Sequence, residues 1–226
     1  MATSGSVTFT LTAREAVTTA LELVKTTMIG SDASALDAAL AQRHANLMLK
    51  TWGANERLWI TTEGTITLLA ATASYALTTA RRVSSVRRRT SGVDTPLIML
   101  SRREYNDYPS KAATGMPFQA FFDAQRTVRT LYVVGVPDAT IALSTTLPYT
   151  YDRVIEDISD LANDIDIPQE WLEAFVYSLA ARLLIPYGRY VVDPASAAEI
   201  KGRAQELYGQ LSAQDDESGS IFLQPA

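Results

Sequence analysis

The sequence predicts an α+β fold: a helical bundle from the N- and C-terminal segments, a central, mostly antiparallel β insertion and an extended C-terminal tail. Two observations predict it. Near both ends of the 226-residue chain, apolar residues recur every three to four positions, which is the spacing of amphipathic helices. In the middle they alternate with polar residues between short turn sequences, as in strands. The predicted helical bundle is discontinuous and covers residues 1–55 and 156–213. The β-rich insertion covers residues 56–155, and the flexible tail covers residues 214–226.

Two helices are expected in the N-terminal segment. Thr12 and Glu15 form the T-x-x-E pattern of a capping box, and a glycine follows the periodic stretch, so the first helix is predicted over residues 12–30. Its apolar stripe consists of Val17, Ala20, Leu21, Val24 and Met28. The second helix begins between residues 31 and 34 and ends near Trp52. One of its sides carries Leu36, Ala39, Leu40 and Leu47.

The middle of the chain has the two-residue period of strands. Alternation over residues 58–62 and 66–70, on either side of Glu63-Gly64, predicts a hairpin whose turn is that dipeptide. A short helical turn is expected over residues 101–107. Further extended segments are expected at residues 82–88, 95–100, 117–122, 130–136 and 140–147.

Two more helices are expected after the β insertion. Pro168 is the expected first residue of one helix, which ends at Pro186-Tyr187-Gly188. Its apolar stripe is Leu172, Phe175, Val176, Leu179 and Leu183. Asp193-Pro194 combines a capping residue with a first-turn proline and predicts the start of the last helix. The apolar positions of that helix are Ile200, Ala204, Leu207, Tyr208 and Leu211.

Composition excludes several classes of active site. The chain has no cysteine, which excludes disulfides, thiolate nucleophiles and cysteine zinc sites. Its one histidine, His44, cannot supply a multi-imidazole metal site and is expected to be a packed residue at the edge of a helix. Phosphate-binding glycine patterns are absent, so no cofactor is expected. Without a signal-like start or an apolar run of about 20 residues, we expect no membrane segment and a cytoplasm-like compartment.

The charge of −5, from 20 basic and 25 acidic residues, is unevenly distributed. Residues 1–150 carry +4 and residues 151–226 carry −9, a split that suits either opposed interaction surfaces or ordinary solvated faces. Residues 64–93 contain no acid and five arginines: Arg81, Arg82, Arg87, Arg88 and Arg89. In an extended strand these arginines would point to both faces, so we expect an exposed edge or an interfacial ribbon. Its partner is either an acidic flank of a neighbouring subunit or a nucleic-acid phosphate.

Carboxylates are the one catalytic residue type in good supply. Four of them precede Pro168: Asp157, Asp160, Asp164 and Asp166. Paired acids serve glycosidases, and acid clusters bind Mg²⁺ or Ca²⁺. The alternative is a solvated acidic linker that leads to the N-terminus of a helix, where negative charge is favourable.

The C-terminal segment ends in an apolar cluster. A polar, acidic stretch over residues 212–220 is followed by Ile221, Phe222 and Leu223. Three adjacent apolar residues in so short a segment are expected to dock, either on their own fold or on another chain.

A series of short segments, taken in order, carries a resemblance to a known family. The segments are LWITTEGT (58–65), TASYAL (72–77), SRREY (101–105), GMPFQAFFD (115–123), TLYVVGVPD (130–138) and EAFVYSLA (173–180). Over about residues 12–212 the chain resembles the head-to-tail adaptors of tailed bacteriophages, the head-completion or tail-tubular-A-like connectors. It departs from the common pattern at residues 76–79, where the family often has a Leu-Pro-x-Asp turn, and in its arginine-rich next strand.

The resemblance implies a structural virion protein without catalytic residues or cofactors. Such adaptors form a ring, expected here to be a dodecamer, between the portal protein and a tail or nozzle protein, and the ring extends the DNA channel and helps to retain packaged DNA. The implied location is the head-tail junction of the virion, after assembly in the host cytoplasm. The implied role of Ile221, Phe222 and Leu223 is to grip the portal. The alternatives are a carboxylate-dependent hydrolase of cell-wall glycan and a DNA-binding protein that uses residues 81–89.

Overall fold

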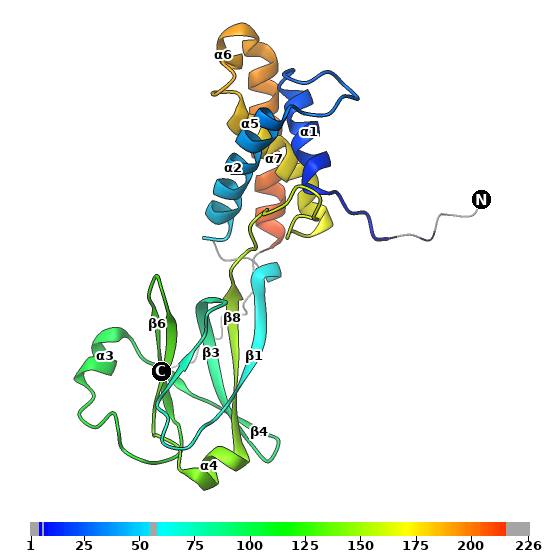
Figure 1. The fold of residues 1–226 in the computed structure, drawn as a ribbon. Coiled ribbons are helices and arrows are strands. Elements are labelled where there is room, and N and C mark those ends of the chain that lie inside the picture. The colour runs from blue at the N-terminus through cyan, green and yellow to red at the C-terminus, as the bar shows by residue number, and fades with distance from the viewer. Residues whose placement is uncertain (1–4, 6, 55–57, 216–226) are drawn as a thin grey trace, which may run out of the picture. The chain divides into compact units, whose positions relative to one another are not determined.

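The computed structural model of the protein describes residues 5, 7–54 and 58–215. They form two units (Figure 1). Residues 1–58 and 155–226 belong to the helical unit, and residues 59–154 form the β unit. The predicted α+β class is confirmed: helices dominate one unit and two mostly antiparallel sheets make up the other.

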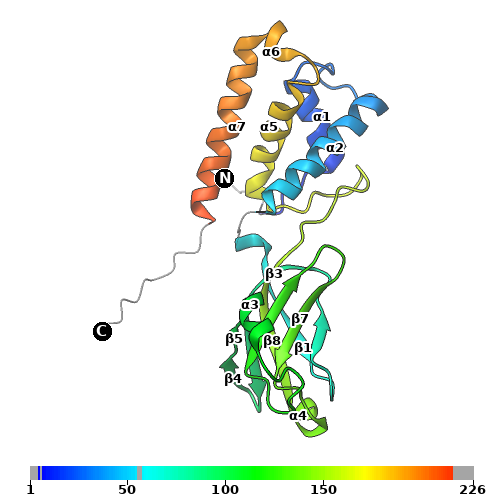
Figure 2. The ribbon, with the colours of Figure 1, turned by 90° about the vertical axis from the view of Figure 1, so that its left-hand side faces the viewer.

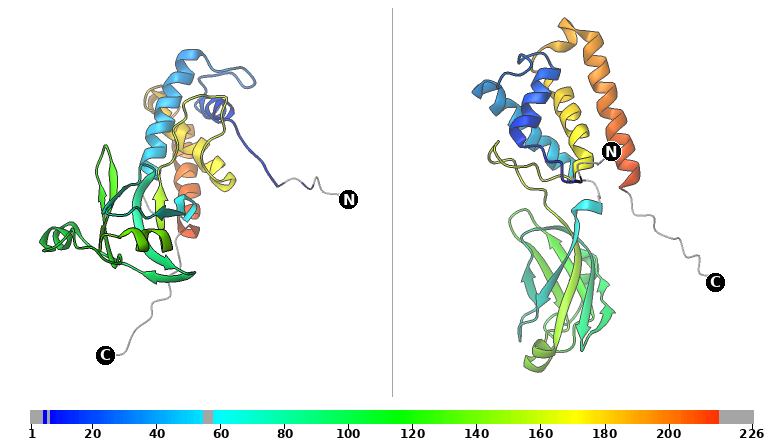
Figure 3. Two further views of the ribbon diagram at one scale, coloured as in Figure 1. Left: turned by 60° about the horizontal axis from the view of Figure 1, so that its bottom comes forward. Right: turned by 90° about the vertical axis from the view of Figure 1, so that its right-hand side faces the viewer.

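The helical unit is built around α5, which packs against α1, α2 and α7. In two views α5 lies between α7 and the two N-terminal helices (Figure 2 and Figure 3). The elements of this unit are α1 (Ala13–Leu23), α2 (Ala35–Trp52), the 3-10 turn η2 (Gln169–Trp171), α5 (Leu172–Leu183), α6 (Arg189–Val192) and α7 (Pro194–Gln214).

Several helix starts are fixed by the local sequence, as predicted. Thr12 and Glu15 form a reciprocal capping box at the start of α1, in which each side chain accepts a hydrogen bond from the other residue's backbone N–H. Asp193 accepts a hydrogen bond from the backbone N–H of Ser196 at the start of α7. The predicted stripe of α5 is buried throughout. Pro168, however, precedes η2 as its N-cap and is not the first residue of a long helix.

Two predictions about the N-terminal helices are wrong. The first helix ends at Leu23, well before Gly30, because Lys25 adopts a positive φ of 59° and the Thr26 hydroxyl donates to the Leu21 carbonyl. Met28, placed in the buried stripe, is 82% exposed. In α2 the buried side is not the predicted one: Leu36 and Leu47 are exposed, and the buried residues are Ala38, Ala41, Ala45, Met48, Leu49 and Trp52.

The core of the helical unit combines small side chains with one aromatic cluster. Small side chains at a helix contact allow the two axes to approach closely. Trp52 lies against the rings of Trp171, Phe175 and Tyr208, with centroid distances of 5.4, 6.2 and 5.6 Å. The buried alanines are Ala13, Ala16, Ala20, Ala38, Ala41, Ala45, Ala174, Ala180, Ala197 and Ala204.

The β unit contains two four-stranded sheets, with strand orders β1-β8-β3-β4 and β2-β7-β6-β5. All neighbouring strands are antiparallel except β5 and β6. The strands are β1 (Thr61–Thr67), β2 (Ser74–Ala76), β3 (Ala80–Thr90), β4 (Val93–Pro96), β5 (Ile98–Met99), β6 (Gln119–Ala124), β7 (Arg129–Val134) and β8 (Thr145–Arg153). The other elements are η1 (Leu58–Ile60), α3 (Arg102–Asp107) and α4 (Ala139–Ser144).

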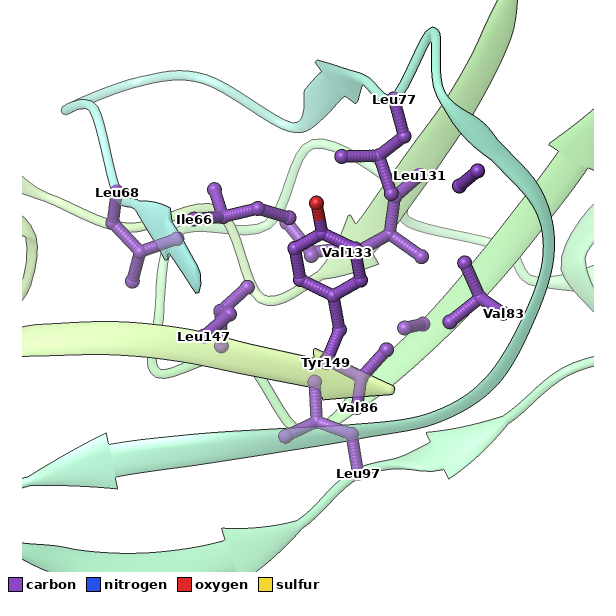
Figure 4. Packing of buried hydrophobic residues seen from close by; sticks show 12 residues of the cluster. Ile66, Leu68, Leu77, Val83, Val86, Leu97, Leu131, Val133, Leu147 and Tyr149 are labelled. Atoms are coloured by element: carbon purple, nitrogen blue, oxygen red, sulfur yellow. The ribbon is translucent and has the colours of Figure 1, made fainter. Parts of the chain in front are cut away.

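Branched aliphatic side chains from both sheets meet in the core of the β unit. Figure 4 shows the phenol ring of Tyr149 among Ile66, Val133 and Leu147. The other members of this cluster are Leu68, Leu77, Ala80, Val83, Val86, Leu97, Ala120 and Leu131. The expected short helix over residues 101–107 is present as α3, which begins with a Ser101–Glu104 capping box.

Two strand predictions are wrong. Glu63-Gly64 is not a turn, because β1 runs straight through it and pairs with β8. Gly64 lies opposite Tyr149, and a Cβ at this position would be only 2.6 Å from the Tyr149 ring, so the glycine makes room for an aromatic side chain. The segment 140–147 begins as α4, since Asp138 accepts a hydrogen bond from the Ile141 N–H and caps a helix there.

The chain enters and leaves the β unit on neighbouring strands. Thr61, at the start of β1, pairs with Asp152, near the end of β8. Among the residues that the structure describes, no helix is sufficiently long and apolar to span a lipid bilayer.

Candidate functional site

The predicted arginine segment forms most of β3. This strand pairs with β8 along one side and, through its C-terminal half, with β4 along the other, so it is not the expected sheet edge. Two register shifts against β8 break the simple alternation of faces. As a result Ala80, Val83 and Val86 all reach the core, although strict alternation would place Val83 and Val86 on opposite faces.

Asp152 of β8 is the centre of a buried charge network at one end of β3. The side chain is 2% exposed, and its Oδ2 accepts from Arg81 Nη2 at 3.3 Å and from Arg82 Nε at 3.0 Å. Its Oδ1 accepts from the Thr61 hydroxyl at 3.1 Å. A buried carboxylate needs such partners, because an unpaired charge in the interior is costly. The network therefore ties three strands, β1, β8 and β3, together.

The other three arginines also bond within the β unit. Arg87 pairs with Glu63 of β1 at 2.5 Å, and Arg88 donates to the backbone carbonyl of Pro117 at 3.1 Å. Arg89 forms a bidentate pair with Asp94 of β4, each hydrogen bond 2.6 Å long. The hydrogen bond from Arg89 holds the pKa of Asp94 below its usual value. Of the two acids, Glu63 comes from another strand and Asp94 follows the turn after β3. This explains why the arginine segment looked unpaired in the sequence.

The acidic residues before η2 do not converge on one point. Asp157 pairs with Lys50 at 2.8 Å, Asp160 accepts from the backbone N–H of Ala162, and Asp166 accepts from that of Glu156. Asp164 lies where the chain bridges to Thr12. Across residues 5, 7–54 and 58–215, no group of three or more histidine or acidic side chains is arranged to hold a metal ion. The geometry favours the linker interpretation of this segment over paired catalytic acids.

His44 is half-buried on α2. Burial lowers its pKa, and the nearby cations of Arg182 and Arg43 lower it further. The imidazole is therefore neutral at pH 7, as expected of a packed residue at the edge of a helix.

An apolar end of the helical unit was missed by sequence reasoning. It consists of five aliphatic side chains that are between 70% and 91% exposed: Met28, Ile29, Ile185, Val191 and Val192. They come from the α1–α2 loop and from the segment around α6, which lie at the same end of the unit (Figure 1). The signal was available, because Met28-Ile29 and Val191-Val192 are apolar runs beside turn residues, where little can cover them.

Polar contacts hold the two segments of the apolar end together. Lys25 pairs with Asp193 at 2.6 Å, and the guanidinium of Arg189 donates to the Lys25 carbonyl. Hydrogen bonds from Lys25 and Ser196 lower the pKa of Asp193 to about 2. Tyr187 donates to Asp37 at 2.5 Å, and burial together with this bond raises the pKa of Tyr187. These bonds fix the two segments that carry the exposed aliphatic side chains relative to each other.

The predicted tail lies almost entirely beyond the part of the chain that the structure covers. The last helix extends to Gln214, the first residue assigned to the tail. Ile221, Phe222 and Leu223 lie outside the described residues.

The two units differ in sign of charge. The β unit contains eleven basic and seven acidic residues, a formal charge of +4. The helical unit contains nine basic and eighteen acidic residues, a formal charge of −9. These totals equal those of the division along the sequence, although the residues differ: residues 1–58 belong to the helical unit and, with five basic and five acidic residues, carry no net charge.

Comparison with known proteins gives one family and two similar structures. The family model described as SU10 adaptor protein matches residues 12–222. A chain from the neck of an empty GTA particle is similar at 15% identity and a TM-score of 0.29, over 76% of this chain and 80% of that one. A chain from the virion of a native gene transfer agent (GTA) particle is similar at 15% identity and a TM-score of 0.32, over 78% and 81%. No curated protein matched the chain.

Proposed function

The chain belongs to the SU10 adaptor protein family of structural bacteriophage proteins, and from this membership we propose that it forms the ring that joins the portal to the tail. The family match over residues 12–222 is the observation that carries the proposal, because it includes both units. The ring extends the DNA channel and helps to retain the packaged genome. The subunits assemble in the host cytoplasm, as a dodecamer, and the ring receives a tail or nozzle protein on its other side.

Two features of the helical unit support assembly into a ring. A ring of identical subunits needs two different patches that fit each other. The −9 charge of the helical unit and the +4 charge of the β unit supply complementary electrostatics for such a contact. The exposed aliphatic side chains of the apolar end supply apolar surface whose burial against a partner is favourable.

The C-terminal cluster is the proposed contact with the portal. Ile221, Phe222 and Leu223 follow an acidic and glycine-containing stretch and have the composition of a short docking motif. The arginines of β3 remain predicted contacts with a neighbouring subunit or with DNA. Their bonds inside the β unit weaken both roles alike, because a guanidinium held by a carboxylate has less charge to offer either a neighbour's acids or a phosphate.

Electron microscopy and size-exclusion chromatography of the purified protein, with and without portal protein, test the proposal. The expected result is a ring alone or a ring that assembles on the portal. A protein that stays monomeric and never binds the portal, at any salt concentration, would contradict the adaptor function.

A triple serine variant tests the tail. Replacing Ile221, Phe222 and Leu223 with serine should leave a folded protein that no longer joins the portal, whereas the matched variant Gln224→Ser should bind normally. Normal portal binding by the triple variant would show that the tail is not the contact.

A further inference from the structure

Helix α2 is apolar on two opposite sides. Its inward side is buried in the core of the helical unit. Its outward side carries the apolar stripe that the sequence predicted, and that stripe is largely uncovered: Leu36 is 86% exposed and Leu47 is 56% exposed. On the same side Ala39 is exposed and Leu40 is half-buried. A helix that is apolar on both sides is typical of a position between two layers of structure, so we expect a partner to cover the outward side.

The outward side of α2 is also hollowed and basic. A depression of about 380 Å³ is lined by residues of α2: Ala39, Gln42, Arg43, Asn46, Leu47 and Lys50. Lys50 is already held by Asp157 at 2.8 Å. Arg43 is exposed, and no ion pair to it lies within the described ranges. The surface that covers α2 should therefore offer an acid and leave room for leucine side chains.

The outward side of α7 leaves such room. Ala195, Gly202, Gly209 and Ala213 are exposed along it, at intervals of seven and four residues that keep them on one side of the helix. A Cβ at Gly202 or Gly209 would meet no atom of the described residues within 4 Å, so packing inside the subunit requires neither glycine. Glycine is unfavourable within a helix, and its presence here suits the close approach of a helix from outside the subunit.

Acidic side chains flank Gly202 on α7. Glu199 and Glu206 lie three and four residues from it, one helical turn to either side. Glu206 is shared with an arginine of the same helix at 3.2 Å. Glu199 is exposed, and in the part of the chain that the structure describes it has no ion pair. The outward side of α7 thus offers a carboxylate that matches the uncompensated cation on the outward side of α2.

The two outward sides are placed for a contact between different subunits. α2 and α7 lie on opposite sides of α5, so one subunit cannot bring their outward sides together (Figure 2 and Figure 3). Both helices begin at the same end of the unit, where Tyr187 bonds to Asp37 and Lys25 to Asp193, and they run in the same general direction. Neighbours in a ring of twelve differ by a rotation of only about 30°, so α2 of one subunit meets α7 of the next in nearly parallel orientation.

We propose that neighbouring subunits of the ring meet through the outward sides of α2 and α7, with Arg43 of one subunit against Glu199 of the next. The register agrees, because Arg43 and Gly202 each follow the first residue of their helix by eight positions, which places Arg43 beside the acids that flank Gly202. Two different surfaces meet, so the contact is heterologous and repeats around a ring. The inference rests on the proposed function, since it specifies the contact that the ring requires.

Cross-linking of two introduced cysteines tests the contact. The chain has no cysteine, so Ala39→Cys on α2 and Gly202→Cys on α7 supply the only thiols, both at exposed positions. In the assembled protein, a short bis-maleimide should join subunits of this double variant into a ladder that extends beyond the dimer on a denaturing gel. Each single variant should remain monomeric on the gel, because it carries a thiol on one side of the contact only.

A second cysteine pair distinguishes this contact from one between a helical unit and a neighbour's β unit. Ala39→Cys combined with Thr127→Cys, at an exposed position between β6 and β7, should give no ladder. A ladder from this pair and none from the α2–α7 pair overturns the proposal. So does a cross-linked dimer of the Ala39→Cys single variant, because α2 would then meet a second α2.

Charge reversal tests the residues within the contact. In the background of the α2–α7 cysteine pair, Arg43→Glu should abolish the ladder, and adding Glu199→Arg should restore it. Arg43→Lys, the matched control, should leave the ladder unchanged, because the position keeps its positive charge. A ladder that survives Arg43→Glu, or one that Glu199→Arg does not restore, contradicts the proposed pairing.

Electron microscopy of the same samples, with portal protein, separates this contact from the adaptor function. If rings form on the portal but the α2–α7 pair gives no ladder, the proposed contact is wrong and the adaptor function stands. If the ladder forms in a protein that never binds the portal, the contact stands and the adaptor function is wrong.

Discussion

The helical unit and the β unit differ in how their most concentrated charges are bonded. In the β unit, all five arginines of β3 donate hydrogen bonds to other strands or loops of the same unit, and the acceptor Asp152 is buried. In the helical unit, several acids accept hydrogen bonds from backbone N–H groups at helix starts and turns, among them Glu15, Asp160 and Asp166. Glu15 does so within a reciprocal capping box.

The difference indicates which unit has uncompensated charge that can interact with a partner. A carboxylate that accepts from the backbone keeps its negative charge uncompensated, whereas an arginine paired with a carboxylate is locally neutral. The surplus of −9 on the helical unit is therefore available to partners, and much of the basic character of β3 is used to join its own strands. Net charge counted along the sequence does not distinguish these two situations.

The largest expected effects come from a pair of variants, one in each unit, of which the first is Gly135→Ala in the β unit. Gly135 has a φ of 91°, and a Cβ there would collide with the Met116 backbone carbonyl. Strain and collision together should lower the free energy of unfolding of the β unit by about 3 kcal/mol or more. Hydrogen exchange, followed separately in each unit, should show loss of protection in the β unit alone.

The matched variant in the helical unit is Phe175→Ala. This ring is fully buried against Trp52, so its removal should cost about 3 to 5 kcal/mol in the helical unit and leave the β unit protected. The predicted boundaries near residues 55 and 155 treat the two units as separate domains. Equal loss of protection in both units, for either variant, would show that they unfold as one.

An intermediate effect is expected from Asp152→Ala. Removing the carboxylate takes away the buried acceptor that Arg81 and Arg82 share, and breaking a fully buried ion pair costs about 3–5 kcal/mol. Because these guanidiniums are 28% and 43% exposed, we expect about 2 kcal/mol, measured by urea unfolding of the β unit.

Asp94→Ala is the control for that variant, since Asp94 also pairs with an arginine of β3 but lies at the surface. It should change stability little. If both variants cost the same, burial of Asp152 is not what makes the network important.

The smallest effect is a pH dependence confined to the helical unit. The pKa of His44 is lowered in the folded state, chiefly by burial, so the unfolded chain binds the proton more readily. The stability that this residue contributes is complete above the ordinary value of 6.5 and is lost as the pH falls through the folded pKa. The denaturant concentration at the unfolding midpoint of the helical unit should therefore decrease when the pH is lowered from about 7.5 to about 5.5.

The β unit, which has no histidine, should keep its midpoint over that range. His44→Gln should remove the pH dependence of the helical unit. A dependence that survives in His44→Gln would have to come from other groups.

What the sequence predicted correctly was encoded in neighbouring residues. The Thr12–Glu15 box, the short helix expected over residues 101–107 and the Asp193-Pro194 start depend on atoms within three or four residues, and each forms as expected. At the end of α1, besides the local hydrogen bond from Thr26 to Leu21, Lys25 contacts Asp193 and Arg189, which are more than 160 residues away. No local pattern contains that information.

The strand errors have the same origin. Gly64 looks like a turn residue until Tyr149, on a strand 85 residues later, is placed opposite it. The register shifts of β3 depend on β8 and are invisible in the alternation of β3 itself. For the candidate site, the arginines were found from the sequence, but their acceptors were not, because Asp152 lies 70 and 71 residues from Arg82 and Arg81.

The pairing of Thr61 with Asp152 has a genetic consequence. Because β1 and β8 are adjacent, the points at which the β unit begins and ends are separated by about one strand spacing, roughly 5 Å. Units with such closely spaced ends can be inserted into, or removed from, a host domain with little disturbance. Recombination at these two points would let one phage lineage exchange the whole insert as a cassette, while the helical host around it is inherited unchanged.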